Sequence, residues 1–198
     1  IDIVTGTSIG AINGALIAQG DYKLASKLWT EFDMGGMLGV DGYKEKGLRE
    51  KLLVSIQTAI KQLPEKGFGL DVSDFRTALA QIIDEKKVRE SPILYGLVTV
   101  DLDNRAPVQK PIHEIPEGKL IDYIMASSAI VPALRPYEID GKRYIDGAYY
   151  DNVPLELAQK QGATKFIVVD LNAFGRINKK LIQNIDQDRI RYIQSYWD

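Results

Sequence analysis

The 198-residue chain has no cysteine, a single histidine and no long run of one charge. The lack of cysteine excludes disulfides, thiolate metal sites and a cysteine nucleophile. A formal net charge of −2 without a basic run argues against a nucleic-acid surface. No apolar run reaches the length of a membrane span, and no signal-peptide pattern is visible. We therefore expect a cytoplasmic protein with no nucleic-acid partner, no metal and no cofactor.

The distribution of apolar residues predicts strands that alternate with helices. Apolar residues make up 45% of the chain and charged residues 26%, which is ordinary for a globular domain. Strand patterns occur at 93–100, 107–112 and 165–170, and Asp140-Gly141 predicts the turn of a hairpin. Helical spacing predicts helices at 9–19, 22–32, 46–63, 73–87, 120–128 and 154–161. This order favours an α/β fold with a mainly parallel sheet covered by helices on both faces.

The two ends of the sequence suggest how the domain is bounded. We expect one domain over 1–198, with a helical tail over 176–198 in which apolar residues alternate with charges of both signs. Packing of this tail on the domain, or on a segment missing from the sequence, is the favoured interpretation, and a membrane-facing or partner-binding helix is the alternative. The sequence begins without methionine inside an apolar strand, so we expect further residues upstream of Ile1.

The most informative stretch is Gly6-Thr7-Ser8-Ile9-Gly10, between a β-branched strand and an apolar helix pattern. On such a turn a serine is lifted above the sheet, with its hydroxyl beside N–H groups at the helix start. Side chains at Gly6 and Gly10 would collide with the neighbouring strand and helix. Ser8 is therefore the candidate nucleophile, and the Ile9 N–H is a candidate oxyanion donor.

The motif has two other interpretations. With Gly at about 7% of residues, Gly-x-Ser-x-Gly arises by chance in roughly one chain in fifteen of this length. In the first interpretation, the glycines only allow the strand and the helix to pack closely. In the second, the turn belongs to a non-catalytic module that binds a phosphate or another anion at the helix N-terminus. The turn has no lysine of the kind found in a P-loop, and its place between strand and helix favours the nucleophile.

A serine hydroxyl needs a base to take its proton. His113 is the only histidine, and it follows a predicted strand among charged residues, a setting that favours a surface or strand-end histidine. The other candidate is Asp146, which ends an apolar strand before a helix opened by proline, although Asp-Gly is also a common turn. A free aspartate is a weak base, so burial has to raise its pKa, and such a base suits esters better than amides.

Three separated blocks of this sequence resemble the patatin-like phospholipase family, and the resemblance covers nearly the whole chain. Residues 6–15 resemble its nucleophile elbow, and 126–132 its Ala-Ser-x-Ala-x-Pro block with one extra residue before the proline. Asp146-Gly147-Ala148, with Asn152 and Pro154, resembles its Asp-Gly-Gly/Ala…Asn-x-Pro block. The resemblance implies a Ser8–Asp146 dyad without histidine, a three-layer α/β/α sandwich and hydrolysis of acyl esters in lipids.

The resemblance also implies a glycine-rich loop that supplies oxyanion-hole N–H groups, and no residues of this sequence match it. An inactive fragment is therefore an alternative to an active hydrolase. The glycine-rich stretch 34–42 is either an ordinary surface loop or a mobile apolar lid. Candidate contacts for an acyl chain are Trp29, Phe32, Met34, Met37 and Leu38. The expected partners are a lipid or small ester substrate and, at the periphery, a membrane surface.

Overall fold

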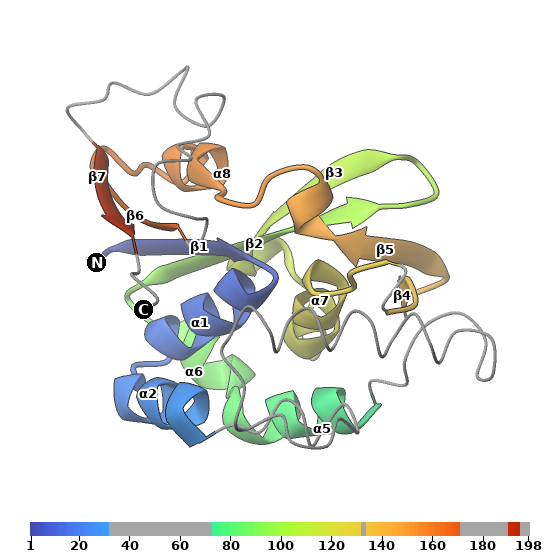
Figure 1. The fold of residues 1–198 in the computed structure, drawn as a ribbon, viewed down its shortest axis with the longest axis horizontal. Coiled ribbons are helices and arrows are strands. Elements are labelled where there is room, and N and C mark those ends of the chain that lie inside the picture. The colour runs from blue at the N-terminus through green and yellow to red at the C-terminus, as the bar shows by residue number, and fades with distance from the viewer. Residues whose placement is uncertain (32–72, 132–133, 171–189, 195–198) are drawn as a thin grey trace.

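β2 (Leu94–Asp101) is the central strand of the main sheet (Figure 1). The structure is a computed structural model that describes residues 1–31, 73–131, 134–170 and 190–194. The run of apolar and β-branched residues in β2 suits a strand buried on both faces. β2 pairs in parallel with β1 (Ile3–Thr7) and antiparallel with β3 (Ala106–Pro111) and β5 (Lys142–Asp146). β4 (Tyr137–Ile139) pairs with β5. The described sheet is mixed, so the expectation of a mainly parallel sheet is not confirmed.

β1 and β5 occupy the same edge of β2, one after the other. β1 accompanies the first part of β2 as far as the Thr7–Val98 pair, and β5 begins its pairing at Asp146 and Thr99. Because β1 is parallel to β2 and β5 is antiparallel, the carboxyl ends of both strands meet at this point. The residue that follows β1 therefore lies beside the last residue of β5.

Helices cover both faces of the sheet. α1 (Ile9–Ala18) and α7 (Leu120–Ser127) pack on one face, where a Cβ at Gly14 would lie 3.1 Å from the Tyr95 ring. The next residue of β2 points to the opposite face, and there a Cβ at Gly96 would lie 3.0 Å from Leu157 of α8 (Leu155–Lys160). The sheet thus lies between α8 and the α1–α7 layer, which confirms the α/β fold (Figure 1).

The other helices that the structure describes lie on the α1–α7 side of the sheet (Figure 1). They are α2 (Tyr22–Glu31), α5 (Ser73–Ile82) and α6 (Glu85–Glu90). Two short 3₁₀ turns follow β3 and β5, namely η2 (Ile112–Glu114) and η3 (Gly147–Tyr149). No helix in the described ranges has both the length and the apolar composition that crossing a bilayer requires.

The predicted helix over 73–87 is two helices. α5 ends at Ile82, and α6 begins at Glu85 after Asp84, whose backbone is extended. The Asp84 carboxylate accepts the Lys87 N–H at 3.2 Å and so caps the second helix. An aspartate at this position competes with continued helix because its side chain replaces a carbonyl as the acceptor for a first-turn N–H.

The predicted helical tail over 176–198 is wrong at 190–194. These residues form β7 (Ile190–Gln194), which pairs in parallel with β6 (Phe166–Asp170). Ile190, Tyr192 and Ile193 favour strands as well as helices, and the free edge of β6 supplies backbone hydrogen-bond partners that sequence spacing does not reveal. The rest of the predicted tail and the predicted helix over 46–63 lie outside the described residues.

Candidate active site

Ser8 forms the turn between β1 and α1 in a conformation that side-chain-bearing residues rarely adopt. Its φ is 56° and its ψ is −124°, in a region that costs about 1–3 kcal/mol for such a residue. A Cβ at Gly6 would lie 2.0 Å from the carbonyl oxygen of Gly10, so the turn requires glycine there. A Cβ at Gly10 would meet no described atom within 4 Å. The predicted collision is therefore correct at Gly6 and wrong at Gly10.

The start of α1 presents two N–H groups beside this serine. The Ser8 carbonyl accepts the N–H groups of Ala11 and Ile12 at 2.9 and 3.4 Å, whereas those of Ile9 and Gly10 bind no described residue. First-turn N–H groups have no acceptor within their helix and carry partial positive charge. Within the described part of the chain, the N–H groups of Ile9 and Gly10 are therefore available to a negatively charged oxygen.

Asp146 is the last residue of β5 and is 1% exposed. Its Oδ1 accepts the Ala148 N–H at 2.8 Å, while Oδ2 has no hydrogen-bond partner among the described residues. Burial raises the pKa of this carboxyl above its usual 3.8, and the Ala148 N–H and the Ser8 hydroxyl lower it in part. The Ser8 hydroxyl therefore lies near enough to act on the carboxylate, although it donates no hydrogen bond to Oδ2. Burial gives Asp146 the stronger basicity that a proton acceptor needs.

The segment after Asp146 is held against the end of β1. A Cβ at Gly147 would lie 2.2 Å from the Val98 carbonyl oxygen and 2.8 Å from Cγ2 of Thr7. The Thr7 hydroxyl in turn donates to the carbonyl of Asp151 at 2.8 Å. The glycine thus allows the close approach, and the threonine fixes the chain that follows.

The end of α7 binds the backbone of both candidate residues. The Ser8 N–H donates to Ser127 Oγ at 2.9 Å, and this hydroxyl donates to the Val98 carbonyl at 2.6 Å. Two residues further on, the Ala129 carbonyl accepts the Asp146 N–H at 3.0 Å. Ser127 belongs to the stretch 126–132 that resembles the Ala-Ser-x-Ala-x-Pro block, but the sequence alone assigns it no contact or role.

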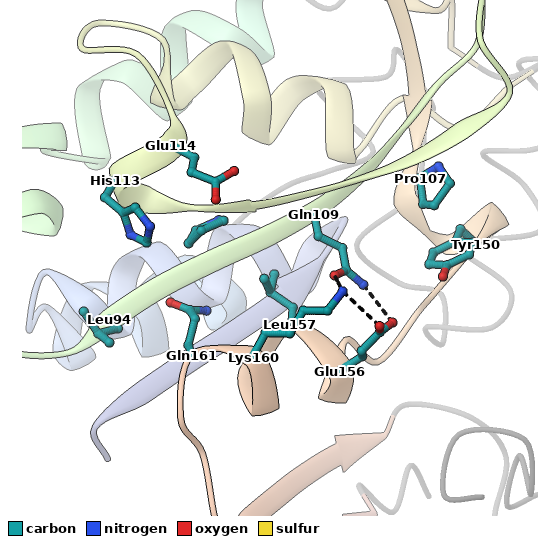
Figure 2. Close-up of a pocket in the computed structure, with 11 residues that line it drawn as sticks. Leu94, Pro107, Gln109, His113, Glu114, Tyr150, Glu156, Leu157, Lys160 and Gln161 are labelled. Atoms are coloured by element: carbon teal, nitrogen blue, oxygen red, sulfur yellow. Dashed lines mark hydrogen bonds and ion pairs between the residues drawn. The ribbon is translucent and has the colours of Figure 1, made fainter. Parts of the chain in front are cut away.

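His113 lies in a different part of the molecule. It lines a cavity of about 560 Å³ between β3 and α8, and neither Ser8 nor Asp146 is among the residues of its walls (Figure 2). The β3 wall consists of residues that alternate along one side of the strand, namely Pro107, Gln109 and Pro111. α8 and the residue after it provide the opposite wall, with Glu156, Leu157, Lys160 and Gln161.

The polar residues of this cavity differ in whether they find partners. Lys160 Nζ donates to Gln109 Oε1 at 2.9 Å and pairs with Glu156 Oε1 at the same distance (Figure 2). Neither Nε2 nor Oε1 of Gln161 has a partner among the described residues, although both atoms are buried. A Cβ at Gly96 would lie 2.8 Å from Gln161 Nε2, so the glycine makes room for this amide. The cavity is distinct from the place where Ser8 and Asp146 meet.

The predicted acyl-chain contacts lie where the structure gives no side chains. Phe32, Met34, Met37 and Leu38, with the glycine-rich stretch 34–42, are outside the described residues. Trp29 belongs to α2, but its side chain is not described. These contacts stay predictions.

The described fold, with helices on both faces of a sheet, is that of an α/β protein, and a strained serine at a strand-to-helix turn lies beside a buried carboxylate. The "Patatin-like phospholipase" family model matches residues 1–158. The chain belongs to the patatin-like phospholipase family.

Two curated relatives illustrate the similarity. The chain is 26% identical over 179 residues to "Patatin-like phospholipase domain-containing protein 7" of Rattus norvegicus, covering 87% of this chain and 12% of the relative. It is 26% identical over 175 residues to "Lysophospholipase NTE1" of Scheffersomyces stipitis, covering 87% and 10%. The chain thus spans about a tenth of the length of these relatives. Among solved structures, VipD from Legionella pneumophila aligns with a TM-score of 0.48 and 14% identity, over 97% of this chain and 43% of that one.

Proposed function

We propose that this chain is a lipid acyl hydrolase in which Ser8 is the nucleophile and Asp146 the base. The observation that carries the proposal is that a serine with a φ of 56° and a carboxylate that is 1% exposed adjoin at one point of the sheet. β2 brings them together because Val98 pairs with the end of β1 and Thr99 with the end of β5. Membership of a family named for phospholipases supports a lipid ester as the substrate.

The reaction follows from the positions of these groups. Ser8 Oγ attacks the carbonyl carbon of the ester, and its proton passes to Asp146. The Ile9 N–H stabilises the negatively charged oxygen of the tetrahedral intermediate. When this intermediate collapses, the bond to the alkoxide breaks and Asp146 protonates the leaving group. Water then attacks the acyl-enzyme, Asp146 accepts the proton of the water, and Ser8 Oγ leaves and regains a proton.

The substrate class follows from the strength of the base. A free carboxylate is a weaker base than imidazole, and burial raises the pKa of Asp146 above its ordinary value. An ester is suited to it because an alkoxide needs less help to leave than an amine does. Oδ2 of Asp146 has no hydrogen-bond partner among the described residues. We assign this oxygen as the atom that accepts the proton of the Ser8 hydroxyl.

Labelling with a fluorophosphonate tests this proposal directly. The protein is treated with the probe, the adduct is mapped by peptide mass spectrometry, and hydrolysis of lysophosphatidylcholine is measured in parallel. We expect labelling at Ser8, and loss of labelling and hydrolysis in Ser8→Ala. Ser26→Ala, which changes an exposed serine of α2, is the matched control and retains both. Full hydrolysis by Ser8→Ala would disprove the proposal.

One observation favours a second function. The N–H groups of Ile9 and Gly10, which bind no described residue, would also bind a phosphate without catalysing a reaction. A non-catalytic anion-binding module would hydrolyse no ester, and inorganic phosphate would raise the unfolding temperature of wild type and Ser8→Ala equally. An active hydrolase predicts ester turnover that is lost in Ser8→Ala.

A further inference from the structure

We infer that Ser127 is a positioning residue that holds the Ser8 turn in register with Asp146. This inference deepens the proposed function and rests on it. Ser127 is the last residue of α7 and is fully buried, at 0% exposure. Its hydroxyl uses one acceptor site and its only donor, since it accepts the Ser8 N–H and donates to the Val98 carbonyl.

The bond from Ser127 to Val98 lies at the point where β2 changes partners. Thr7 is the last residue of β1 to pair there, and the next position of β2 pairs with Asp146. A buried carbonyl without a partner costs about 1–3 kcal/mol. The hydroxyl satisfies this carbonyl from the helix layer, and so ties α7 to the junction of the two strands.

The bond from Ser8 to Ser127 has two consequences for the reaction. It restrains the nucleophile in a conformation that costs about 1–3 kcal/mol and that an unrestrained chain would leave. It also occupies the Ser8 N–H at 2.9 Å, so that this group is not available to the oxyanion. The oxyanion site at α1 therefore consists of the N–H groups that follow Ser8 in the sequence.

The same helix end also holds the base. The Ala129 carbonyl accepts the Asp146 N–H at 3.0 Å, only two residues after Ser127. The separation of nucleophile and base is thereby set by a short stretch of chain at the end of a buried helix. Ser128 lies between the two contacts, and its buried hydroxyl has no hydrogen-bond partner among the described residues.

Three variants separate positioning from simple stability. Ser127→Ala removes both hydrogen bonds, Ser127→Thr keeps the hydroxyl, and Ser128→Ala removes a neighbouring hydroxyl that binds no described residue. For each variant, fluorophosphonate labelling is followed to completion, and kcat and KM are measured with p-nitrophenyl butyrate. The final extent of labelling counts the competent molecules, and the rate constant reports the reactivity of Ser8.

In Ser127→Ala we expect the labelling rate constant and kcat to fall by about 10–100-fold, because a misplaced nucleophile loses orientation. The final extent of labelling and KM stay at the wild-type values. Ser127→Thr restores most of the rate, and Ser128→Ala changes it little. A normal rate in Ser127→Ala, an equal fall in Ser128→Ala, or a reduced extent at unchanged rate would each overturn the inference. If wild type is not labelled at Ser8, the proposed function itself fails, which is a different outcome.

Discussion

The Ser8–Asp146 junction and the cavity between β3 and α8 both contain buried polar atoms that have no hydrogen-bond partner among the described residues. At the junction this atom is Oδ2 of Asp146, and in the cavity the atoms are the amide N and O of Gln161. At the junction, backbone contacts hold Ser8 and Asp146 in place. These contacts come from a strained turn, two strand ends and the end of a helix. In the cavity, Gln161 is the residue that follows α8, and its N–H donates to the Leu157 carbonyl at 3.2 Å. Its side chain lies beside Gly96.

The two regions differ in the groups that they bring together. The cavity of about 560 Å³ is suited in size to a small molecule, and neither Ser8 nor Asp146 is among the described residues that line it. Catalysis depends on groups held in position before the substrate arrives. Substitutions of Asp146 and Gln161 test whether these two side chains differ in their effect on hydrolysis and on stability.

The largest expected effect is on hydrolysis by Asp146→Asn. If Asp146 is the base as proposed, we expect its loss to lower kcat/KM by about 10²–10⁴-fold, whereas we expect Gln161→Met to leave kcat/KM unchanged. In wild type the acid limb of the pH profile lies above 3.8, because burial raises the pKa of Asp146 and the ionised form is the base. The new Asn-Gly pair deamidates readily, so each preparation is checked by mass spectrometry. Equal hydrolysis by both variants would remove the distinction between the two regions.

The next effect is on stability, and it compares two glycines of the junction. Gly6→Ala places a Cβ 2.0 Å from the Gly10 carbonyl oxygen, and we expect a loss of about 3 kcal/mol or more of unfolding free energy. Gly10→Ala meets open space within α1, and we expect a gain of about 0.5–1 kcal/mol. Urea unfolding measures both. A similar loss for the two variants would mean that the turn does not need close backbone approach at Gly6.

The smallest effect concerns the pH dependence of stability. Burial raises the pKa of Asp146, so the folded state binds its proton more tightly than the unfolded chain does. Wild type therefore loses stability as pH rises from 3.8 through the raised pKa. Asp146→Asn is expected to be more stable than wild type at neutral pH and to lose this advantage below 3.8.

Gln161→Met provides the comparison for that measurement. Removing two unpartnered polar atoms is expected to add about 1 kcal/mol at neutral and at acidic pH alike, because no group titrates. Thermal unfolding at both pH values measures the two variants together. An advantage of Asp146→Asn that persists unchanged at acidic pH would contradict the assigned pKa shift.

The local elements of the fold were predictable where one residue type determines the backbone. Asp140-Gly141 predicts a hairpin turn, and the structure has φ values of 51° and 77° at these two residues between β4 and β5. The start of α1 after Ser8 and its end near Gly20 follow from the elbow and from a glycine at the helix terminus. In these places the signal lies within a few residues.

Long-range pairing was not predictable in the same way. Nothing in the sequence spacing shows that β1 and β5 share one edge of β2, because strand order is decided by packing between distant segments. The parallel pairing of β7 with β6 escaped for the same reason. The helical spacing of apolar residues could not distinguish this strand from a helix.

In the candidate site, too, individual residues were predictable from the sequence, whereas their arrangement in space was not. Ser8 and Asp146 could be singled out from local motifs and from a family resemblance, whereas their nearness depends on the register at Val98 and Thr99. Ser127 carries no motif that names its contacts, since these are made through hydrogen bonds to the backbone of two distant segments. Such contacts become visible only in three dimensions.

β3 has a consequence for how molecules of this protein meet one another. Among the described strands it lies at an edge of the main sheet, with Pro107 opposite Val100 and Pro111 opposite Gly96. Proline has no N–H and is tolerated in sheets where that group would face outward. The outward-facing backbone positions of β3 are Pro107, Gln109 and Pro111. Of these three, only Gln109 has a backbone N–H to donate. A strand from another molecule would meet an interrupted row of donors, so this edge resists intermolecular sheet extension and the aggregation that follows from it.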